Sequence, residues 1–591
     1  DHETAAEVES LRKMLDAMRI TMIRKIGVGG MGVVFEAYDQ HRGEIVALKT
    51  MRKVGPEALG RFKQEFRSLA DIAHVNLVSL FQLFAVDDHW FFTMELIEGT
   101  DFLTHVRRDV HASDGPLAAD VGRPERRFHE DRLRRALIQL VEGVHYLHGC
   151  GKLHRDLKPT NVLVAEEGRV VVLDFGLTAD FTSLERESAG ERQIVGTAAH
   201  MSPEQSAGRE ASPASDWYSV GVMLFQALTG RLPFEGSVES VIADKQRRDA
   251  PSPDAPAEEL PADLVALCRD LLDRNPGARP SGTMILDRLQ GRVPSVDKAD
   301  ELVRTAPIIG RERHLRVFVS AYESMKSGRI ETIFLHGKSG TGKTTLLQAF
   351  LGDLEKRGEA VVLAGRCHER ESVPFKALDA VIDALAQYLK TLCPSILMTI
   401  LPTDVIHLAR LFPVLRGVEG VAALIEETAG AADPQEGRLR AFTGLRELLV
   451  RISARSPLVL AIDDLQWGDA DSAVLLADLL YSPDPPVLLF VASFGQEEAA
   501  KSRFLQILRQ VQSRVGTMVS RHDLAVEPLG VNEARALALS LLHGDGTRAQ
   551  AHLVARESAG NPLFIDELVK HIQMGRLAAL SDAPGRIDLD D

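Results

Sequence analysis

The stretch HRDLKPTN occupies residues 154–161, and the triplet DFG follows at residues 174–176 after a short hydrophobic hairpin. Eight specified letters in one run leave little to chance. Upstream of this stretch, residues 20–100 contain short runs with the alternation typical of strands. Residues 130–290, which include the stretch, have patterns that are mostly helical. A β-rich lobe followed by an α-rich lobe predicts an α+β bilobal fold with a cleft.

A glycine-rich segment lies upstream, where Gly27, Gly29, Gly32 and Val34 form the pattern GxGxxGxV. Glycines let a backbone turn approach phosphate oxygens without Cβ clashes. A dinucleotide site would need a helix after these glycines, but the following residues VVFEAYD continue as a strand. We therefore expect the glycines to cap a hairpin.

Further motifs surround the central stretch. The strand VALK ends in Lys49, which suits the α- and β-phosphates of a nucleotide, and Glu65 lies in a helix-like run from which it can orient that lysine. Taken alone, this pair would be read as a surface ion pair. Downstream come Ser202-Pro203-Glu204, Asp216 in the run DWYSVG, and Arg279 before a proline. In this order and spacing, the chain resembles the eukaryotic-type protein kinases.

The resemblance implies ATP and Mg²⁺ and a role for each matched residue. Asp156 would accept the proton of a substrate hydroxyl, and Lys158 would neutralise charge on the transferred phosphoryl group, while Asn161 and Asp174 would hold Mg²⁺. Such residue types suit phosphoryl transfer, which depends on positioning and charge neutralisation. A lysine two residues after the aspartate is typical of Ser/Thr kinases rather than tyrosine kinases. The residues implied around adenine are Glu95 and Leu96 at the hinge and Val34, Ala47 and Leu163 against the ring faces.

Structural roles follow from the same resemblance. Asp216 would brace the catalytic loop, and Glu204 would pair with Arg279. Thr197 would bridge the catalytic aspartate and lysine. His200 stands where the family commonly has an aromatic residue that helps to shape the peptide platform, which puts the peptide preference in question.

The resemblance also implies control by phosphorylation, because Arg155 stands where the family pairs an arginine with a phosphorylated residue of the activation segment. Sequence alone does not rank the hydroxyls of that segment. The candidates are Thr178, Thr182, Ser183 and Ser188.

A second phosphate-binding motif follows a charged, proline-bounded linker. The sequence GKSGTGKT at residues 337–344 satisfies GxxxxGK[ST] between a strand-like and a helix-like run. Backbone N–H groups of this loop, with its glycines Gly337, Gly340 and Gly342, would cradle the β-phosphate. Lys343 would reach the β- and γ-oxygens, and Thr344 would complete the Mg²⁺ coordination.

The run LVLAIDD at residues 458–464 predicts a buried strand that ends in two acids. Asp463 suits the Mg²⁺ shell and Asp464 the polarisation of water. By itself, an acidic pair after a strand is often a helix cap, but a phosphate loop in the same chain favours the nucleotide site. Strand-like runs alternating with helical stretches predict an α/β fold with a parallel sheet.

Three stretches resemble the signal-transduction ATPases with numerous domains, which are AAA-like switches. They are GRE at 310–312, LQW at 465–467 with Asp469, and GNPLF at 560–564. The resemblance implies that the nucleotide state selects between conformations. Pro562 could equally be only a helix start. These ATPases often carry an arginine after the strand that ends here at Gly495, so hydrolysis is expected to be slow, or an arginine to come from Arg503 or a neighbouring protomer.

Composition excludes several other classes. The chain has 591 residues, 45% of them hydrophobic, and 69 Lys and Arg against 84 Asp and Glu. A net charge of −15 disfavours a phosphate-backbone footprint, so no nucleic-acid partner is expected. No apolar run reaches the ~20 residues of a membrane span. Four scattered cysteines without a CxxC pair fit a cytoplasmic protein. Because the first residue is Asp and the last stretch is polar, we expect both ends to be cut from a longer polypeptide.

Together, these patterns predict a cytoplasmic Ser/Thr protein kinase fused to a P-loop ATPase that regulates it, acting on a protein substrate and able to self-associate. Its rival is a nucleotide-gated scaffold whose kinase-like lobe only binds partners. A transcription regulator would need a basic helix-turn-helix, which is not visible. The expected segments are an N-terminal helix (1–19), the kinase domain (20–290), a linker (291–307), the ATPase domain (308–520) and a helical C-terminal segment (521–591).

Overall fold

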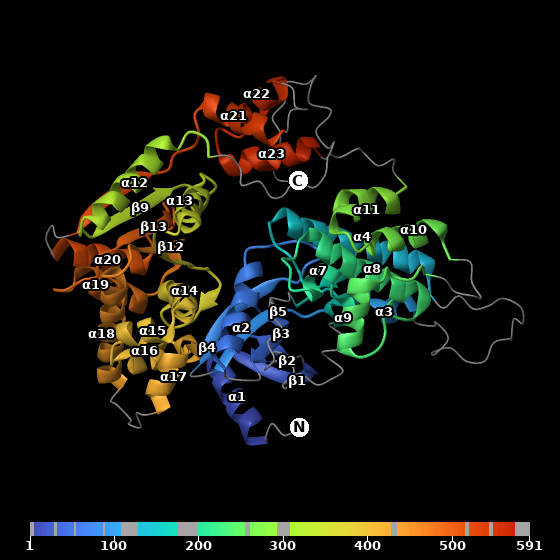
Figure 1. Ribbon diagram of the computed structural model, residues 1–591, viewed down its shortest axis with the longest axis horizontal. Coiled ribbons are helices and arrows are strands. Elements are labelled where there is room, and N and C mark those ends of the chain that lie inside the picture. Colours follow the sequence, from blue (N-terminus) through green and yellow to red (C-terminus); the bar gives the residue numbers. More distant parts are fainter. Residues whose placement is uncertain are drawn as a thin grey trace, which may run out of the picture. The chain divides into compact units, whose positions relative to one another are not determined.

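The computed structural model describes residues 5–28, 32–51, 55–86, 89–107, 128–174, 198–253, 260–291, 308–426, 434–514, 519–542 and 548–573. The chain divides into two compact units (Figure 1). The first comprises residues 1–54 and 61–303, and the second comprises residues 55–60 and 304–591. Each unit has its own sheet and its own core.

An antiparallel sheet in the order β1-β2-β3-β5-β4 opens the first unit. Phe62 and Phe66 of helix α2 pack their rings against Phe92 of this sheet. The N-terminal helix α1, which the sequence analysis predicts, buries Leu11 and Leu15 against it. The bounds are α1 (Ala5–Ala17), β1 (Ile20–Val28), β2 (Gly32–Asp39), β3 (Glu44–Met51), α2 (Pro56–Leu69), β4 (Leu80–Val86) and β5 (His89–Glu95).

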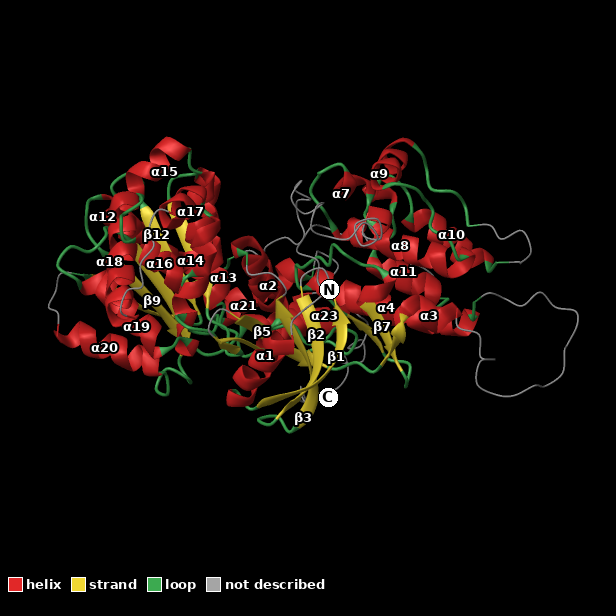
Figure 2. Ribbon diagram, turned by 90° about the horizontal axis from the view of Figure 1, so that it is seen from below, coloured by secondary structure: helices red, strands yellow, loops and turns green. Residues whose placement is uncertain are grey.

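The remainder of the first unit is mostly helical, as expected (Figure 2). Helix α8 is its centre, because nearly every side chain from Ser215 to Leu228 is buried. The small sheet β6-β7-β8 carries the segment that follows HRDLKPTN. The bounds are β6 (Gly99–Asp101), α3 (Phe102–Arg107), α4 (Glu130–Gly149), η2 (Pro159–Asn161), β7 (Val162–Ala165), β8 (Val170–Val172), α7 (Pro203–Ser206), α8 (Pro213–Thr229), α9 (Val238–Arg247), α10 (Ala262–Leu271), η3 (Pro276–Ala278) and α11 (Gly282–Leu289).

A parallel sheet in the order β10-β12-β13-β9-β14 forms the centre of the second unit. Strand β12 is buried throughout, and its residues alternate between two apolar clusters. Leu458 and Leu460 face the cluster of α14, α18 and α19, whereas Val459 and Ala461 face the cluster of α12 and α13. Helices therefore cover both faces, which explains the continuous apolar runs of these strands.

The elements of the second unit are α12 (Glu312–Lys326), β9 (Glu331–Gly337), α13 (Lys343–Arg357), β10 (Val361–Arg366), β11 (Glu371–Ser372), α14 (Lys376–Thr391), α15 (Pro394–Ile400), α16 (Val405–Leu411), η4 (Pro413–Gly417), α17 (Glu419–Glu426), α18 (Pro434–Ser453), β12 (Leu458–Asp463), η5 (Leu465–Trp467), α19 (Ala470–Tyr481), β13 (Leu489–Gly495), α20 (Arg503–Arg514), β14 (Ser520–Ala525), α21 (Val531–Leu541), α22 (Arg548–Glu557) and α23 (Pro562–Gln573). Helices α21, α22 and α23 share a separate apolar cluster that includes Ala534 and Ile565.

One predicted boundary is corrected by the sheet. The sequence places the end of the ATPase domain at residue 520, but residues 520–525 form β14, which pairs in parallel with β9. This strand is at the edge of the sheet and its side chains alternate between half-buried and exposed, so it lacks the apolar run that marks the other strands.

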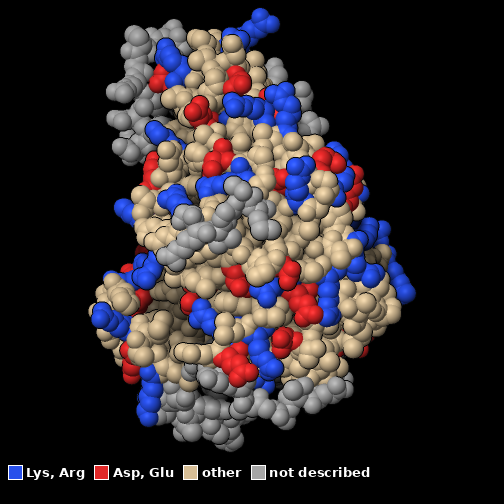
Figure 3. Space-filling model, turned by 90° about the vertical axis from the view of Figure 1, so that its left-hand side faces the viewer, with Lys and Arg blue, Asp and Glu red and all other residues tan. Residues whose placement is uncertain are grey.

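Two surface properties bear on the predicted partners. No helix in the described part of the chain is long and apolar enough to cross a membrane. On the face shown in Figure 3, Lys and Arg side chains are interspersed with Asp and Glu side chains. Charges of both signs therefore share this face.

Candidate functional site

Lys49 on β3 lies at the centre of a buried charge cluster in the first unit. Its Nζ is 2.6 Å from Oε1 of Glu65 on α2 and 2.7 Å from Oδ1 of Asp174. The sequence predicts the pair with Glu65, and the two side chains are 5% and 7% exposed, so the alternative of a surface pair is wrong. The chain thus brings together residues from a strand, a helix and the DFG segment.

The charges of this cluster depend on one another. Burial alone would lower the pKa of Lys49, but the charges of Glu65 and Asp174 outweigh burial and raise it. Burial raises the pKa of Glu65 to about 7 against the opposing effect of Lys49. Burial would also raise the pKa of Asp174, but Lys49 outweighs it and holds that pKa below its usual value. The lysine therefore stays cationic beside an ionised Asp174.

The candidate catalytic loop groups Asp156, Lys158 and Asn161. The Nζ of Lys158 donates to Oδ2 of Asp156 at 2.7 Å, and Nδ2 of Asn161 donates to the same oxygen at 3.1 Å. Nδ2 of Asn161 also donates to the backbone oxygen of Asp156 at 2.9 Å. Because its amide nitrogen is engaged, Asn161 has its side-chain oxygen left for a ligand such as a cation.

A buried carboxylate holds this loop in place. Asp216 accepts hydrogen bonds from the backbone N–H groups of His154 and Arg155 at 2.9 and 2.8 Å, and its Oδ2 is 2.8 Å from Nε2 of His148. Arg155 has φ of 67°, a backbone conformation that non-glycine residues rarely adopt. Asp216 thus fixes the turn just before Asp156, as its expected bracing role requires. His148 was not predicted, since a histidine in an amphipathic helix carries no local signal.

A second buried pair supports the downstream segment. Arg279 donates from Nη1 and Nη2 to the two carboxylate oxygens of Glu204 at 2.7 and 2.9 Å, and Ser215 donates to Glu204 at 2.7 Å. This two-point geometry is the strong form of an arginine–carboxylate contact. The expected Glu204–Arg279 pair is present.

The residues expected around adenine lie on the strands that the sequence predicts. Val34 and Ala47 are on adjacent strands β2 and β3, Glu95 ends β5, and Leu163 is on β7. Glu95 forms an ion pair with Arg169. Leu96 follows β5, and Ala47 is buried while Val34, Leu96 and Leu163 are half-buried. Their contact with a nucleotide base stays a prediction.

The glycine-rich segment forms the expected hairpin, since β1 and β2 pair antiparallel with Gly27 opposite Val34. Position 32 requires glycine for a steric reason, because a Cβ there would lie 2.0 Å from the carbonyl oxygen of Thr50. Several predicted residues lie outside the described residues. They are Gly29, the DFG residues Phe175 and Gly176, the hydroxyl candidates Thr178, Thr182, Ser183 and Ser188, and Thr197.

In the second unit, the phosphate-loop motif connects β9 to α13. Gly340 and Gly342 have φ of 77° and 90°, which glycine adopts readily, and a Cβ at Gly337 would lie 2.4 Å from the carbonyl oxygen of Val526. Lys343 is 8% exposed, and its Nζ donates to the carbonyl oxygens of Gly337 and Lys338 at 3.1 and 2.8 Å. Burial lowers the pKa of Lys343 because its ammonium group is poorly solvated. An anion in the loop would be attracted to this group.

The two acids after β12 face this loop. Thr344 Oγ1 donates to Oδ2 of Asp463 at 2.8 Å, which places the hydroxyl and the carboxylate together as predicted. Burial and then Asp464 raise the pKa of Asp463, whereas hydrogen bonds from Ser493 and Thr344 and the charge of Arg366 lower it. The Thr344 hydroxyl and the Asp463 carboxylate are hard oxygen donors, which Mg²⁺ prefers as ligands.

Arg366, at the end of β10, was missed by the sequence reasoning. Its Nε is 2.8 Å from Oδ2 of Asp464 and 3.8 Å from Oδ2 of Asp463. Parallel pairing sets Arg366 opposite Asp463, which no local pattern reveals. For Arg503, the expected alternative cation, no ion pair is found among the described residues.

The stretches GRE and GNPLF both contact the phosphate loop. Nη2 of Arg311 donates to the carbonyl oxygens of Thr341 and Glu527 at 2.9 and 2.7 Å. Nδ2 of Asn561 donates to the carbonyl oxygen of Ser339 at 3.1 Å. Pro562 starts α23, so it has the helix-start role that the sequence left open. The C-terminal helices are therefore tied directly to the loop.

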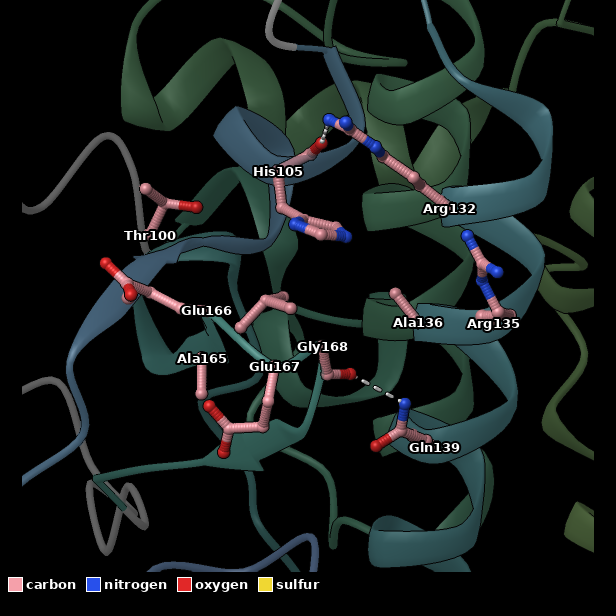
Figure 4. A pocket seen from close by; sticks show the side chains of 12 residues that line it. Thr100, His105, Arg132, Arg135, Ala136, Gln139, Ala165, Glu166, Glu167 and Gly168 are labelled. Atoms are coloured by element: carbon pink, nitrogen blue, oxygen red, sulfur yellow. Dashed lines mark hydrogen bonds between the residues drawn. The ribbon is translucent and has the colours of Figure 1, made fainter.

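A separate cavity of about 760 Å³ lies in the first unit (Figure 4). Arg132 and Arg135 line it from α4, and Glu166 and Glu167 line it from the β7–β8 turn. No predicted catalytic residue lines it. Val164, the neighbour of the predicted adenine contact Leu163, also lines the cavity.

Comparisons with known proteins agree with both halves of this description. Residues 20–289 match the family model of the protein kinase domain, and residues 307–491 match that of the AAA ATPase domain. Serine/threonine-protein kinase PknA of Mycobacterium tuberculosis is 32% identical over 269 residues, which are 44% of this chain and 58% of PknA. Serine/threonine-protein kinase PrkC of Bacillus subtilis is 29% identical over 308 residues, 50% of this chain and 45% of PrkC.

A third relative is serine/threonine-protein kinase pkn3 of Myxococcus xanthus, which is 30% identical over 295 residues, 48% of this chain and 50% of pkn3. The chain spans about half the length of these curated relatives. All three relatives are named serine/threonine-protein kinases, and all three come from bacteria.

Proposed function

Because the chain carries a protein kinase domain followed by an AAA ATPase domain, we propose that it transfers the γ-phosphoryl group of ATP to serine or threonine hydroxyls of a protein. The observation that carries the proposal is the convergence of Lys158 and Asn161 on Oδ2 of Asp156, beside an intact Lys49–Glu65 pair. A lobe that only bound partners would not require this grouping.

In the proposed reaction, the hydroxyl oxygen of the substrate forms a bond to the γ-phosphorus while the bond to the β,γ-bridging oxygen breaks. Asp156 accepts the hydroxyl proton. Lys158 balances the charge of the transferred group, and Lys49 holds the α- and β-phosphates. Asp216 keeps Asp156 oriented through the backbone of the preceding residues.

The donor set fits Mg²⁺. Asn161 offers its amide oxygen and Asp174 a carboxylate whose pKa is held low, so both can act as hard oxygen ligands at neutral pH. The cation, when bound with ATP, neutralises charge on the phosphate oxygens. In the second unit, Thr344 and Asp463 would hold the corresponding cation, and Asp464 would polarise water.

We further propose that the second unit is a nucleotide-dependent switch of the signal-transduction ATPase type that regulates the kinase. Its support is the hydrogen bond from Asn561 to the phosphate loop, because a nucleotide in that loop would alter a contact made by the C-terminal helices. Self-association belongs to the same proposal, since a neighbouring copy could supply the arginine absent at Gly495. Four free cysteines fit a cytoplasmic location.

Incubation of the intact chain with γ-labelled ATP and a library of peptides centred on Ser or Thr tests the proposal. We expect label on Ser or Thr of peptides, lost in Asp156→Asn and retained in Asp131→Asn, an exposed aspartate on α4. Lys343→Ala should keep transfer but change its response to ATP concentration. Label transfer that survives in Asp156→Asn would contradict the proposal, and no label transfer by the wild-type chain would favour the scaffold.

A further inference from the structure

Lys245 in helix α9 is fully buried, with 0% of its surface exposed. Its neighbours Gln246 and Arg247 on the same helix are exposed. Lysine is almost never buried completely unless its charge is matched by partners. The position therefore requires an explanation that the proposed chemistry does not supply.

The partners of Lys245 are three backbone carbonyl groups of one short segment. Its Nζ donates to the oxygens of Ala198, Ala199 and Met201 at 2.9, 2.7 and 2.5 Å. An ammonium group has three N–H donors, so all three are matched. The Nζ also lies 5.4 Å from the ring centre of Tyr218.

The remaining carbonyl of this segment has a side-chain donor as well. Ser219 Oγ on α8 donates to the oxygen of His200 at 2.8 Å. Residues 198–200 form a short helical stretch that does not continue, and its carbonyl groups have no following turn to pair with. Lys245 and Ser219 thus replace that turn and fix four successive peptide groups.

The same segment leads into the catalytic loop. Ser202 caps α7, and Gln205 of α7 donates from Nε2 to the backbone oxygen of Arg155 at 3.2 Å. Gln246 beside Lys245 also donates to the oxygen of Pro203 at 2.5 Å. A continuous series of hydrogen bonds therefore joins α9 to the residue before Asp156.

We propose that Lys245 is a positioning residue for the protein substrate: by holding residues 198–201, it keeps the surface on which the substrate peptide lies in register with Asp156. This inference rests on the proposed kinase function and on the peptide-platform role expected near His200. It assigns peptide affinity to a residue that contacts neither ATP nor the transferred group.

The contacts of Lys245 separate this role from ATP binding. Burial lowers the pKa of Lys245 to about 7, so the charged amine is costly in this position without the three carbonyl groups. Without the amine, those carbonyl groups would lack a donor and the segment would shift toward water. Lys49 binds Glu65 and Asp174, whereas the carbonyl partners of Lys245 lie in residues 198–201. The ATP-binding residues would therefore keep their geometry.

Steady-state kinetics of the intact chain test the proposal, with the best peptide that the wild-type chain selects from the Ser/Thr library. We expect Lys245→Met to raise KM for the peptide by about 10-fold, while KM for ATP changes by less than about 2-fold. Lys245→Arg, which keeps a charged donor, should recover part of the peptide affinity. Arg247→Met on the exposed face of α9 is the matched control and should change neither constant.

Equal changes in both KM values, or an unchanged peptide KM in a folded Lys245→Met chain, would overturn the proposal. If Lys245→Met fails to fold, Lys245→Arg is compared with the wild-type chain instead. A raised KM for the peptide with an unchanged KM for ATP then supports the proposal, and an unchanged KM for the peptide overturns it. Failure of the proposed function is distinct, because the wild-type chain itself would then transfer nothing to the peptide.

Discussion

Lys49 of β3 and Glu65 of α2 form a buried ion pair with 2.6 Å between Nζ and Oε1. Because the pair is buried from water, loss of the Glu65 carboxylate removes a main group that orients Lys49 toward phosphate. We predict that Glu65→Gln lowers kcat/KM for ATP by on the order of 10-fold, and that Lys49→Met lowers it by on the order of 100-fold. Peptide phosphorylation at varied ATP concentration measures both.

An exposed pair at the start of the same strand provides the control. Glu44 pairs with Arg42 and both side chains are more than 40% exposed. Glu44→Gln should alter kcat/KM by less than about 2-fold. A similar loss in Glu44→Gln and Glu65→Gln would show that burial of the Lys49 pair has no special role.

The Arg279–Glu204 pair should matter for stability. Arg279→Ala removes both arginine donors of the buried Glu204 carboxylate and its charge partner, so we expect a loss of about 3–5 kcal/mol in the local stability of α7 and α8. Arg134→Ala breaks the exposed Arg134–Asp263 pair and should cost less than about 1 kcal/mol. Hydrogen exchange with mass spectrometry reports both, and equal losses would contradict the argument.

The lowered pKa of the buried Asp216 carboxylate predicts that the stability of the folded chain depends on pH. Burial would raise its pKa, but the hydrogen bond and charge of His148 outweigh burial and hold the pKa below its usual value. The unfolded chain therefore takes up this proton at a higher pH than the folded chain. The stabilisation is present above about pH 4 and is lost as the pH falls through the folded pKa.

Asp216→Asn should consequently reduce the protection of residues 154–156 at pH 7 and weaken its decline toward pH 3. Protection factors from hydrogen exchange, corrected for intrinsic exchange rates, measure this. Asp131→Asn serves as the control. An acid dependence in Asp216→Asn that equals the wild-type dependence would show that other groups account for it.

Arg366 should influence the ATPase site through the two acids. Its charge lowers the pKa of Asp463, which burial and Asp464 raise. Since the ionised carboxylates are the active form, Arg366→Ala should move the acid limb of the ATP hydrolysis profile to higher pH. The pH profile of ATP hydrolysis measures this shift, in an Asp156→Asn background that removes the contribution of the first unit. An unshifted acid limb would exclude this role.

Much of the site follows from the sequence because its parts are short and chemically specific. HRDLKPTN places Asp156, Lys158 and Asn161 on a single loop, so their proximity needs no knowledge of the fold. The phosphate loop is similar, since its strand and helix flank it directly. The pairs with Glu65 and Arg279 span longer separations, and only the resemblance to kinases predicted them.

The remaining features depend on tertiary structure. Strand β14 has no apolar run, and its place beside β9 is decided by the sheet edge. Arg366 reaches Asp464 only because β10 and β12 run parallel and in register. Lys245 lies in a helix whose last turn also carries Arg247, so its letters indicate a surface position. Burial of a charged group is set by what packs against it.

The central claim is that the first unit donates phosphoryl groups to an alcohol through Asp156. The most direct measurement is single-turnover transfer from γ-labelled ATP to a Ser/Thr peptide by the wild-type, Asp156→Asn and Lys343→Ala chains. We predict that Asp156→Asn slows transfer by on the order of 1,000-fold while still binding ATP, and that Lys343→Ala still transfers. Undiminished transfer by Asp156→Asn, or transfer abolished only in Lys343→Ala, would contradict the account.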